Sequence, residues 1–194
     1  MAVMLDYIMS AMIFGVLALT VARMQVNINS TLYDNTFNLR VQGNAVALAL
    51  QIEKDFVKMG FRVSPSSGNQ ITLADTTRIT FNSDWLKNNS ISSVAYQAGD
   101  STETTGTPNV HDFPLYRNGL KQDWGLTNFR IAYYDSTESK LSTPLSAADR
   151  LKIRAIQVWF KIQSPEPVIS NIDTTWPAVT WQKMMYPRNL NSSL

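Results

Sequence analysis

The sequence predicts an α+β protein in which one long N-terminal α-helix packs on the antiparallel β-sheet of a globular head. Three observations lead to this fold class. Residues 1–22 form an almost continuous apolar run, apolar residues then recur at helical spacing, and beyond Gly60 their spacing changes to two. The expected division is an apolar helix tip (1–24), an amphipathic helix that continues into the head (25–59) and a β-rich head (60–194).

The apolar tip is long enough to cross a membrane, since about 20 helical residues span a bilayer core. Three interpretations fit this segment. A cleaved signal peptide normally has a basic region before its apolar core, but no Lys or Arg precedes Arg23. A plain anchor with Arg23 on its cytoplasmic flank would place the head in the cytoplasm. The third interpretation is a mature N-terminus from which a basic leader was removed on the cytoplasmic side.

Asp6 is the unusual residue of the tip, because a carboxylate inside an apolar span costs roughly 2.5–3.5 kcal/mol on insertion scales. In one interpretation, Asp6 interacts with the positive end of the helix in its first turn. In the other, it pairs with the free α-amine of a neighbouring subunit and sets the register of a filament. Arg23, the nearest other cation in the chain, is about 25 Å away along a helix and cannot reach Asp6.

These features resemble the N-terminus of type IV pilins, pseudopilins and related filament subunits. After leader removal those chains begin with an apolar stretch of about 20 residues, long enough to span a bilayer, and carry a carboxylate near the fifth position. Here the carboxylate is Asp rather than the usual Glu, and it is the fifth residue only if the mature chain starts at Ala2. The first-position Phe and the proline common in the family are absent. The resemblance implies leader cleavage, N-methylation and assembly through the tip.

Residues 25–59 are expected to continue the helix, since they contain no proline and one glycine, Gly43. Their apolar residues form two stripes, which together predict one wide apolar face. The first stripe is Ile28, Leu32, Leu39, Val46, Leu50 and Val57, and the second, interpreted as domain core, is Val41, Ala45, Leu48, Ile52 and Phe56. Gly60 is the expected C-cap. In pilins the part of the helix just beyond the tip can lose its helical structure and become extended chain in the filament. By this resemblance, the segment that becomes extended here would be Asn27–Asn38 or the neighbourhood of Gly43.

Seven strands are predicted in the head from alternating apolar residues and flanking turn residues. They are Gln70–Leu73, Arg78–Asn82, Ser90–Gln97, Pro114–Arg117, Thr127–Tyr134, Lys152–Gln163 and Val179–Met185. Gly99–Asn109 is predicted to be a long exposed loop. The succession of these pieces, with the ending Tyr186-Pro-Arg-Asn-Leu190, resembles the J-type minor pseudopilins of type II secretion and the W-type minor pilins. This second resemblance covers most of the chain.

The sequence contains no arrangement of residues that predicts catalysis. Cysteine is absent, which excludes disulfides and thiol nucleophiles, and the single histidine, His111, has no second metal ligand at helical or strand spacing. No cofactor is expected. The resemblance to secretion pseudopilins, some of which carry calcium in their heads, implies one alternative. This is a calcium site in the loop Asp135–Lys140 or the loop Asp84–Asp100, although neither loop has the ligand spacing of an EF-hand. The net charge of +2 and the aromatic residues in strand patterns argue against nucleic acid as a partner.

The expected function is a structural, non-enzymatic subunit of a type IV pilin-like filament, or fimbrium. Its partners would be copies of itself or other pilins, the inner-membrane assembly machinery, and the membrane before assembly. It would lie in the bacterial inner membrane and then in a cell-surface or periplasmic filament that serves adhesion or secretion. The alternatives are a minor pseudopilin of a type II secretion system and a non-polymerising, single-pass membrane-anchored binding domain.

The site residues follow from this assignment. Subunit assembly is expected to depend on Met1, Leu5, Asp6 and Phe14. The membrane-embedded segment, which becomes the filament core, is expected to contain Val3, Ile8, Ile13, Val16, Leu17 and Leu19. No metal-ligating residue is expected.

Overall fold

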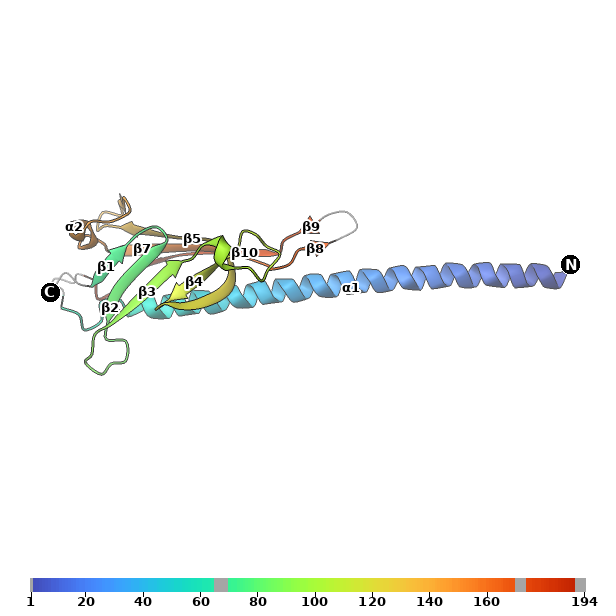
Figure 1. Ribbon diagram of the computed structural model, residues 1–194, viewed down its shortest axis with the longest axis horizontal. Helices are drawn as coiled ribbons and strands as arrows, with labels where there is room; N and C mark the ends of the chain where they lie inside the picture. The colour runs from blue at the N-terminus through green and yellow to red at the C-terminus, as the bar shows by residue number, and fades with distance from the viewer. Residues whose placement is uncertain (1, 65–69, 170–173, 191–194) are drawn as a thin grey trace.

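The computed structural model describes residues 2–64, 70–169 and 174–190. Its largest element is α1 (Ala2–Val57), a single helix of 56 residues that projects far beyond the head (Figure 1). At 1.5 Å per residue, α1 is about 84 Å long. The helix ends two residues earlier than the sequence predicted, and a turn follows in which Gly60 has a φ of +73°, a conformation that favours glycine.

The head is built on one antiparallel sheet, which confirms the predicted α+β class. Seven strands form the path β1 (Ile71–Ala74), β2 (Arg78–Ser83), β3 (Ser92–Ala98), β4 (Phe113–Arg117), β5 (Leu120–Tyr134), β7 (Ala155–Gln163) and β10 (Ala178–Met185). The short β6 (Lys140–Leu141) pairs with β5, and β8 (Val168–Ile169) pairs with β9 (Thr174–Thr175) in a separate hairpin. Each of the seven predicted strands is therefore present, with shifted ends.

The largest shift is in β5, which begins at Leu120 rather than Thr127. Asn118 and Gly119 both have positive φ angles, of 52° and 78°, so they form the tight turn of the β4–β5 hairpin. Gly125, with a φ of +75°, lies next to shifts in register on both sides of β5. These shifts indicate a β-bulge, which allows the polar stretch before Thr127 to continue the strand. Because the bulge interrupts the alternation of apolar and polar residues, the sequence pattern does not predict this part of β5.

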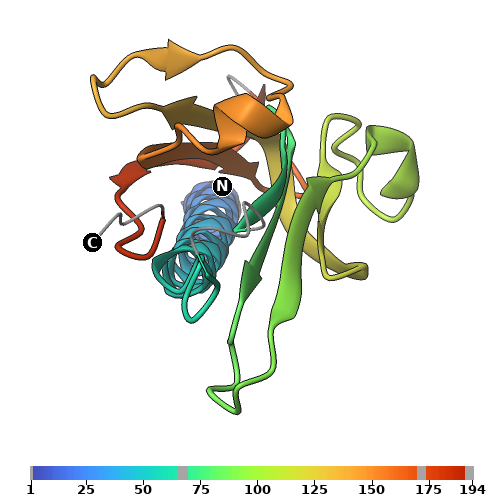
Figure 2. The same ribbon diagram turned by 90° about the vertical axis from the view of Figure 1, so that its left-hand side faces the viewer.

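The sheet curls around the head half of α1, so that the helix lies on its concave side (Figure 2). The helix contributes Val41, Leu48, Ile52 and Phe56 to the core, all at most 2% exposed. The sheet contributes alternate residues of its strands, among them Ile79, Phe81, Tyr96, Leu115, Ile131, Ile156, Val158, Phe160 and Ile162. The prediction that the second helical stripe is domain core agrees with this burial.

Two further elements are too short for the sequence pattern to show. The predicted exposed loop Gly99–Asn109 contains a 3₁₀ turn, η2 (Ser101–Glu103), whose start is capped by Asp100, and its residues are mostly exposed. A one-turn helix, α2 (Ala147–Arg150), is capped by the hydroxyl of Ser146. The C-terminal motif reaches the core at Leu190, which is 5% exposed.

Candidate assembly surface on the N-terminal helix

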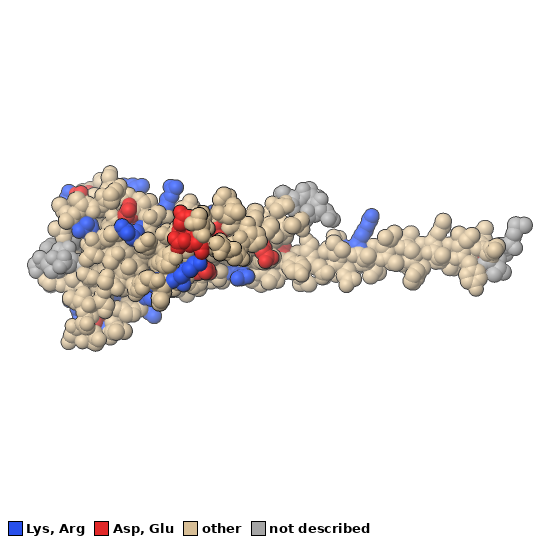
Figure 3. Space-filling view, in the orientation of Figure 1, with Lys and Arg blue, Asp and Glu red and all other residues tan. Residues whose placement is uncertain are grey.

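The part of α1 that lies farthest from the head, residues 4–26, projects freely and is called the arm here (Figure 1). Fourteen large apolar side chains of the arm are each between 57% and 77% exposed. They lie on all sides of the helix, and Figure 3 shows an arm surface almost free of charged side chains on the face in view. A helix that is apolar all round is found inside a large protein or a membrane. The arm therefore needs an apolar environment that the single chain does not supply.

Most of the predicted assembly residues lie on this arm. Leu5, Asp6 and Phe14 are exposed, and so are the expected core residues Ile8, Ile13, Val16, Leu17 and Leu19. Met1 lies outside the described residues, and the side chain of Val3 is not described. Among the described residues there is one helix, α1, that is both long enough and apolar enough to cross a membrane. The coarse expectation of a membrane-compatible N-terminal helix is thus met.

Asp6 does not lie in the first helical turn. The helix begins at Ala2, and no acidic residue lies in its first turn, where the positive end of the helix exerts most of its effect. Asp6 is exposed and takes part in none of the ion pairs of the described residues. The position of Asp6 therefore weakens the interpretation that it serves only to cap the helix.

The two apolar stripes beyond the arm do not form one wide face, which corrects the sequence prediction. Successive helical residues are about 100° apart, so Val46, Leu50 and Val57 point away from the buried Leu48 and Ile52. The first stripe is exposed along its whole length and is called the outer stripe here: Ile28, Leu32, Leu39, Val46, Leu50 and Val57. It extends the apolar surface of the arm along the side of α1 opposite the head.

The stretch between arm and head is polar but helical. Thr31, Thr36 and Asn38 each donate a side-chain hydrogen bond to the carbonyl oxygen four residues earlier. These bonds satisfy the polar side chains within the helix itself. Both candidates for an extended segment, Asn27–Asn38 and the neighbourhood of Gly43, are helical in this single chain.

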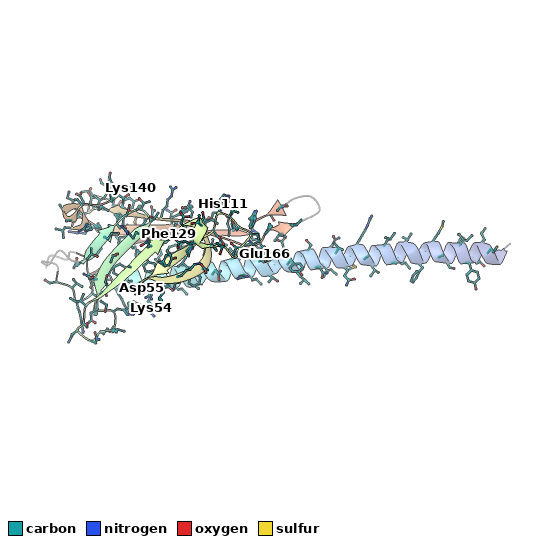
Figure 4. All side chains as sticks on the ribbon, in the orientation of Figure 1. Lys54, Asp55, His111, Phe129, Lys140 and Glu166 are labelled. Atoms are coloured by element: carbon teal, nitrogen blue, oxygen red, sulfur yellow. The ribbon has the colours of Figure 1, made fainter. Side chains whose placement is uncertain are left out.

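A buried polar cluster fixes how α1 is rotated against the sheet. Figure 4 places Asp55 on the part of α1 that lies against the head. The Asp55 carboxylate, 1% exposed, accepts a 2.6 Å hydrogen bond from the Tyr96 hydroxyl on β3 and bonds of 2.7 and 3.2 Å from the Arg117 guanidinium on β4. Burial, and then the Asp55 charge, raise the pKa of Tyr96 above its usual 10. The cluster holds the outer stripe away from the head.

Sequence reasoning did not identify this cluster. Asp55 lies among Glu53, Lys54 and Lys58 in the sequence and looks like part of a solvated charged turn. Its partners are 41 and 62 residues away along the chain. A possible signal was an acidic residue beside the buried-stripe position Phe56, where an isolated charge would be costly.

Carboxylates in the two loops considered for calcium are already engaged by other groups of the protein. The Asp84 carboxylate accepts from the backbone amides of Asn88 and Asn89 and pairs with Arg62 at 3.0 Å. Asp135 similarly accepts from its own turn, at residues 137 and 139. Among the described residues, no group of three or more His, Cys, Asp or Glu side chains could hold a metal ion.

The head also has a cleft of about 230 Å³ where it meets α1. Arg40 and Asn44 of the helix line it, together with Asp112, Asp123 and the indole of Trp124. Within this lining, the Thr107 hydroxyl donates a 2.7 Å hydrogen bond to the Asp112 carboxylate. His111 lies on an exposed loop before β4.

No protein-family model, curated protein or solved structure matches this chain. The assignment of a function therefore depends on the surface of α1 and on the resemblances carried by the sequence.

Proposed function

We propose that this chain is a structural subunit of a type IV pilin-like filament, assembled through α1, and that it is not an enzyme. The observation that supports this proposal is a long exposed apolar surface on α1 that no described part of the chain covers. It begins on the arm and continues along the outer stripe as far as Val57, beside the head. Such a surface needs a partner along almost the full length of the helix.

The size of the surface indicates how strongly it requires burial. Removing a large apolar side chain from water is worth about 1.5–3 kcal/mol. For the fourteen exposed side chains of the arm, the sum is on the order of 20–40 kcal/mol. That exceeds the whole folding stability of a typical domain, which is about 5–15 kcal/mol. The arm is therefore either in a membrane or packed against protein.

The length of the surface favours self-assembly over simple anchoring. A bilayer core about 30 Å thick accepts about 20 helical residues. The helix that carries both the arm and the outer stripe extends from Met4 to Val57, which is 54 residues. A membrane can bury the arm but leaves the outer stripe beside the head exposed to water. Packing against copies of the same helix buries both parts, so a filament accounts for the surface that a non-polymerising anchored domain leaves uncovered.

The proposal includes a location and partners. Before assembly the arm lies in the bacterial inner membrane, where the assembly machinery meets it. After assembly the helices form the interior of a cell-surface or periplasmic filament and the heads cover the outside. A minor pseudopilin of type II secretion would use the same surface but would need another subunit to polymerise.

The test is a charge placed on the arm and a matched charge placed on the head. Phe14→Arg puts an unpaired cation into the proposed filament core and should abolish filaments in negative-stain images and in pelleting assays. Leu151→Arg is the control, because Leu151 is 44% exposed and directly follows α2, which lies on the side of the head away from α1 (Figure 1). The control should polymerise normally, and membrane fractionation should show both variants inserted.

Three results would refute or narrow this assignment. Normal filament yield from Phe14→Arg would remove the arm from the assembly interface. Wild-type chain that stays monomeric in detergent at every concentration, alone and with other pilins, would identify an anchored binding domain instead. Polymer formed only in the presence of a major subunit would identify a minor pilin or pseudopilin.

A further inference from the structure

Between its start and Tyr33 the chain contains two charged side chains of opposite sign, Asp6 and Arg23. Both side chains are exposed, and within the part of the chain that the structure describes neither belongs to an ion pair. Both lie on one uninterrupted helix, where their difference in residue number corresponds to an axial separation of about 25 Å. The two charges therefore cannot neutralise each other within one chain.

Packing of the arm in a filament would bury both charges. A charge left unpaired in an apolar interior is costly, and a partner must then come from another copy. Parallel copies displaced by the axial separation of the two charges place Asp6 of one chain level with Arg23 of the next. One displacement thus satisfies both charges, and repetition along the filament satisfies every copy except those at the two ends.

We propose that the Asp6 carboxylate of each copy pairs with the Arg23 guanidinium of a neighbouring parallel copy, and that this pair sets an axial stagger of about 25 Å. The pairing rests on the proposed function, because it needs helices packed side by side. The contact joins two different surfaces of the chain, and contacts of this kind build open filaments rather than closed dimers. A planar guanidinium can bind a carboxylate through two parallel hydrogen bonds, which suits a contact that fixes position.

The structure leaves Arg23 accessible for this contact. The first helical residue beyond Arg23 that the head half-covers is Ser30, about 10 Å farther along α1. Val168 and Ile169 of β8 line a shallow hollow together with Ser30, Tyr33 and Phe37 of the helix. With respect to residues 2–64, 70–169 and 174–190, the guanidinium is thus exposed and open to a neighbouring helix.

The competing partner of Asp6 is the α-amine of a neighbouring chain, which requires an axial displacement of only about 7.5 Å. That arrangement would satisfy Asp6 but would leave Arg23 in the packed arm without a carboxylate. The Arg23 pairing satisfies both charges, and this difference favours it. The two arrangements also predict different consequences for changes at Arg23.

The first experiment exchanges the charges. Asp6→Arg and Arg23→Asp should each reduce pelleted polymer by at least about tenfold, the loss expected when one member of a buried pair is removed. The double variant with both changes should restore polymer to within about twofold of wild type. Arg78→Gln, at an exposed position on β2, is the control for loss of a positive charge and should have no effect.

The second experiment measures the stagger directly. The chain contains no cysteine, so introduced thiols report a single contact. The double variant Ser10→Cys with Asn27→Cys places its two thiols as many residues apart as Asp6 and Arg23, one helical turn farther along the helix than the charged pair. If neighbouring copies have the proposed stagger, oxidation of filaments should join residue 10 of one copy to residue 27 of the next and give a ladder of covalent multimers. Thiols so far apart in one chain cannot form an internal disulfide. Ser10→Cys with Thr20→Cys has an offset shorter by about two helical turns and should give no ladder.

The outcomes separate the pairing from the proposed function. Wild-type filaments together with normal polymer from Arg23→Asp, or with no ladder from Ser10→Cys with Asn27→Cys, would overturn the pairing and leave the filament assignment standing. Loss of polymer from N-terminal acetylation but not from Arg23→Asp would identify the α-amine as the partner. Wild-type chains that do not self-associate would overturn both proposals.

Discussion

Replacement of Asp55 by alanine tests whether the buried polar cluster holds α1 on the sheet. The change removes the acceptor of the Tyr96 hydroxyl, which is fully buried, and the counter-ion of Arg117, whose side chain is 25% exposed. A buried hydroxyl without an acceptor costs about 1–3 kcal/mol. Removing one partner of a buried ion pair costs about 3–5 kcal/mol, and the partial exposure of Arg117 places the expected loss near the lower end, at about 3 kcal/mol.

The assay is chemical denaturation followed by tryptophan fluorescence, for which the chain provides five tryptophans. Asp55→Asn keeps an acceptor for Tyr96 but removes the charge, so it should lose about half as much stability as Asp55→Ala. Glu53→Gln is the matched control two residues away, because the Glu53–Lys183 pair is partly exposed and worth under about 1 kcal/mol. Equal losses from Asp55→Ala and Glu53→Gln would refute the role of the cluster in stability.

Three further changes test other parts of the structure. Leu50→Glu should leave the free energy of unfolding of the head, measured in urea titrations, within about 0.5 kcal/mol of wild type, because Leu50 is exposed in the single chain. It should lower filament yield, because the proposed filament buries the outer stripe. Gly125→Ala should lower the free energy of unfolding, measured by the same titration, by about 1–3 kcal/mol, since its Cβ would lie 2.6 Å from a backbone oxygen at a positive φ. The Thr137 hydroxyl, and then backbone amides, lower the pKa of Asp135 below 3.8. The resulting stabilisation is complete at a pH above the pKa of Asp135 in the unfolded chain, and it is lost as the pH falls through the lower pKa in the folded protein. Asp135→Asn should therefore make the free energy of unfolding depend less on pH in the acid range.

The sequence predicted the fold class because its two periods are clear. A long stretch without proline gives one helix, and strict alternation, as in Ile156, Val158 and Phe160, gives buried strands. The elements that it missed have two to four residues, such as β6, β8, β9 and α2, and so are too short to show a period. The early part of β5 was missed for a different reason, because the bulge at Gly125 interrupts its alternation.

The candidate surface was only partly predictable. The apolar arm is readable from composition, whereas the exposure of the outer stripe depends on how α1 is rotated against the sheet. That rotation is set by contacts such as Asp55 with Arg117, which join positions 62 residues apart and leave no local pattern. Both apolar stripes look suitable for a core, and only tertiary packing decides which of them is buried.

The seating of α1 in the curled sheet has a mechanical consequence. If a flexible linker joined the head to the arm, a pulling force would first extend the linker and would not load the contacts between the helix and the sheet. Here the chain enters the head as a helix whose last third is held by the core residues from Val41 to Phe56, by the Asp55 cluster and by the Glu53–Lys183 bridge. A pull along the helix loads these contacts in shear, all at once. Drag on the head is therefore passed directly to the arm.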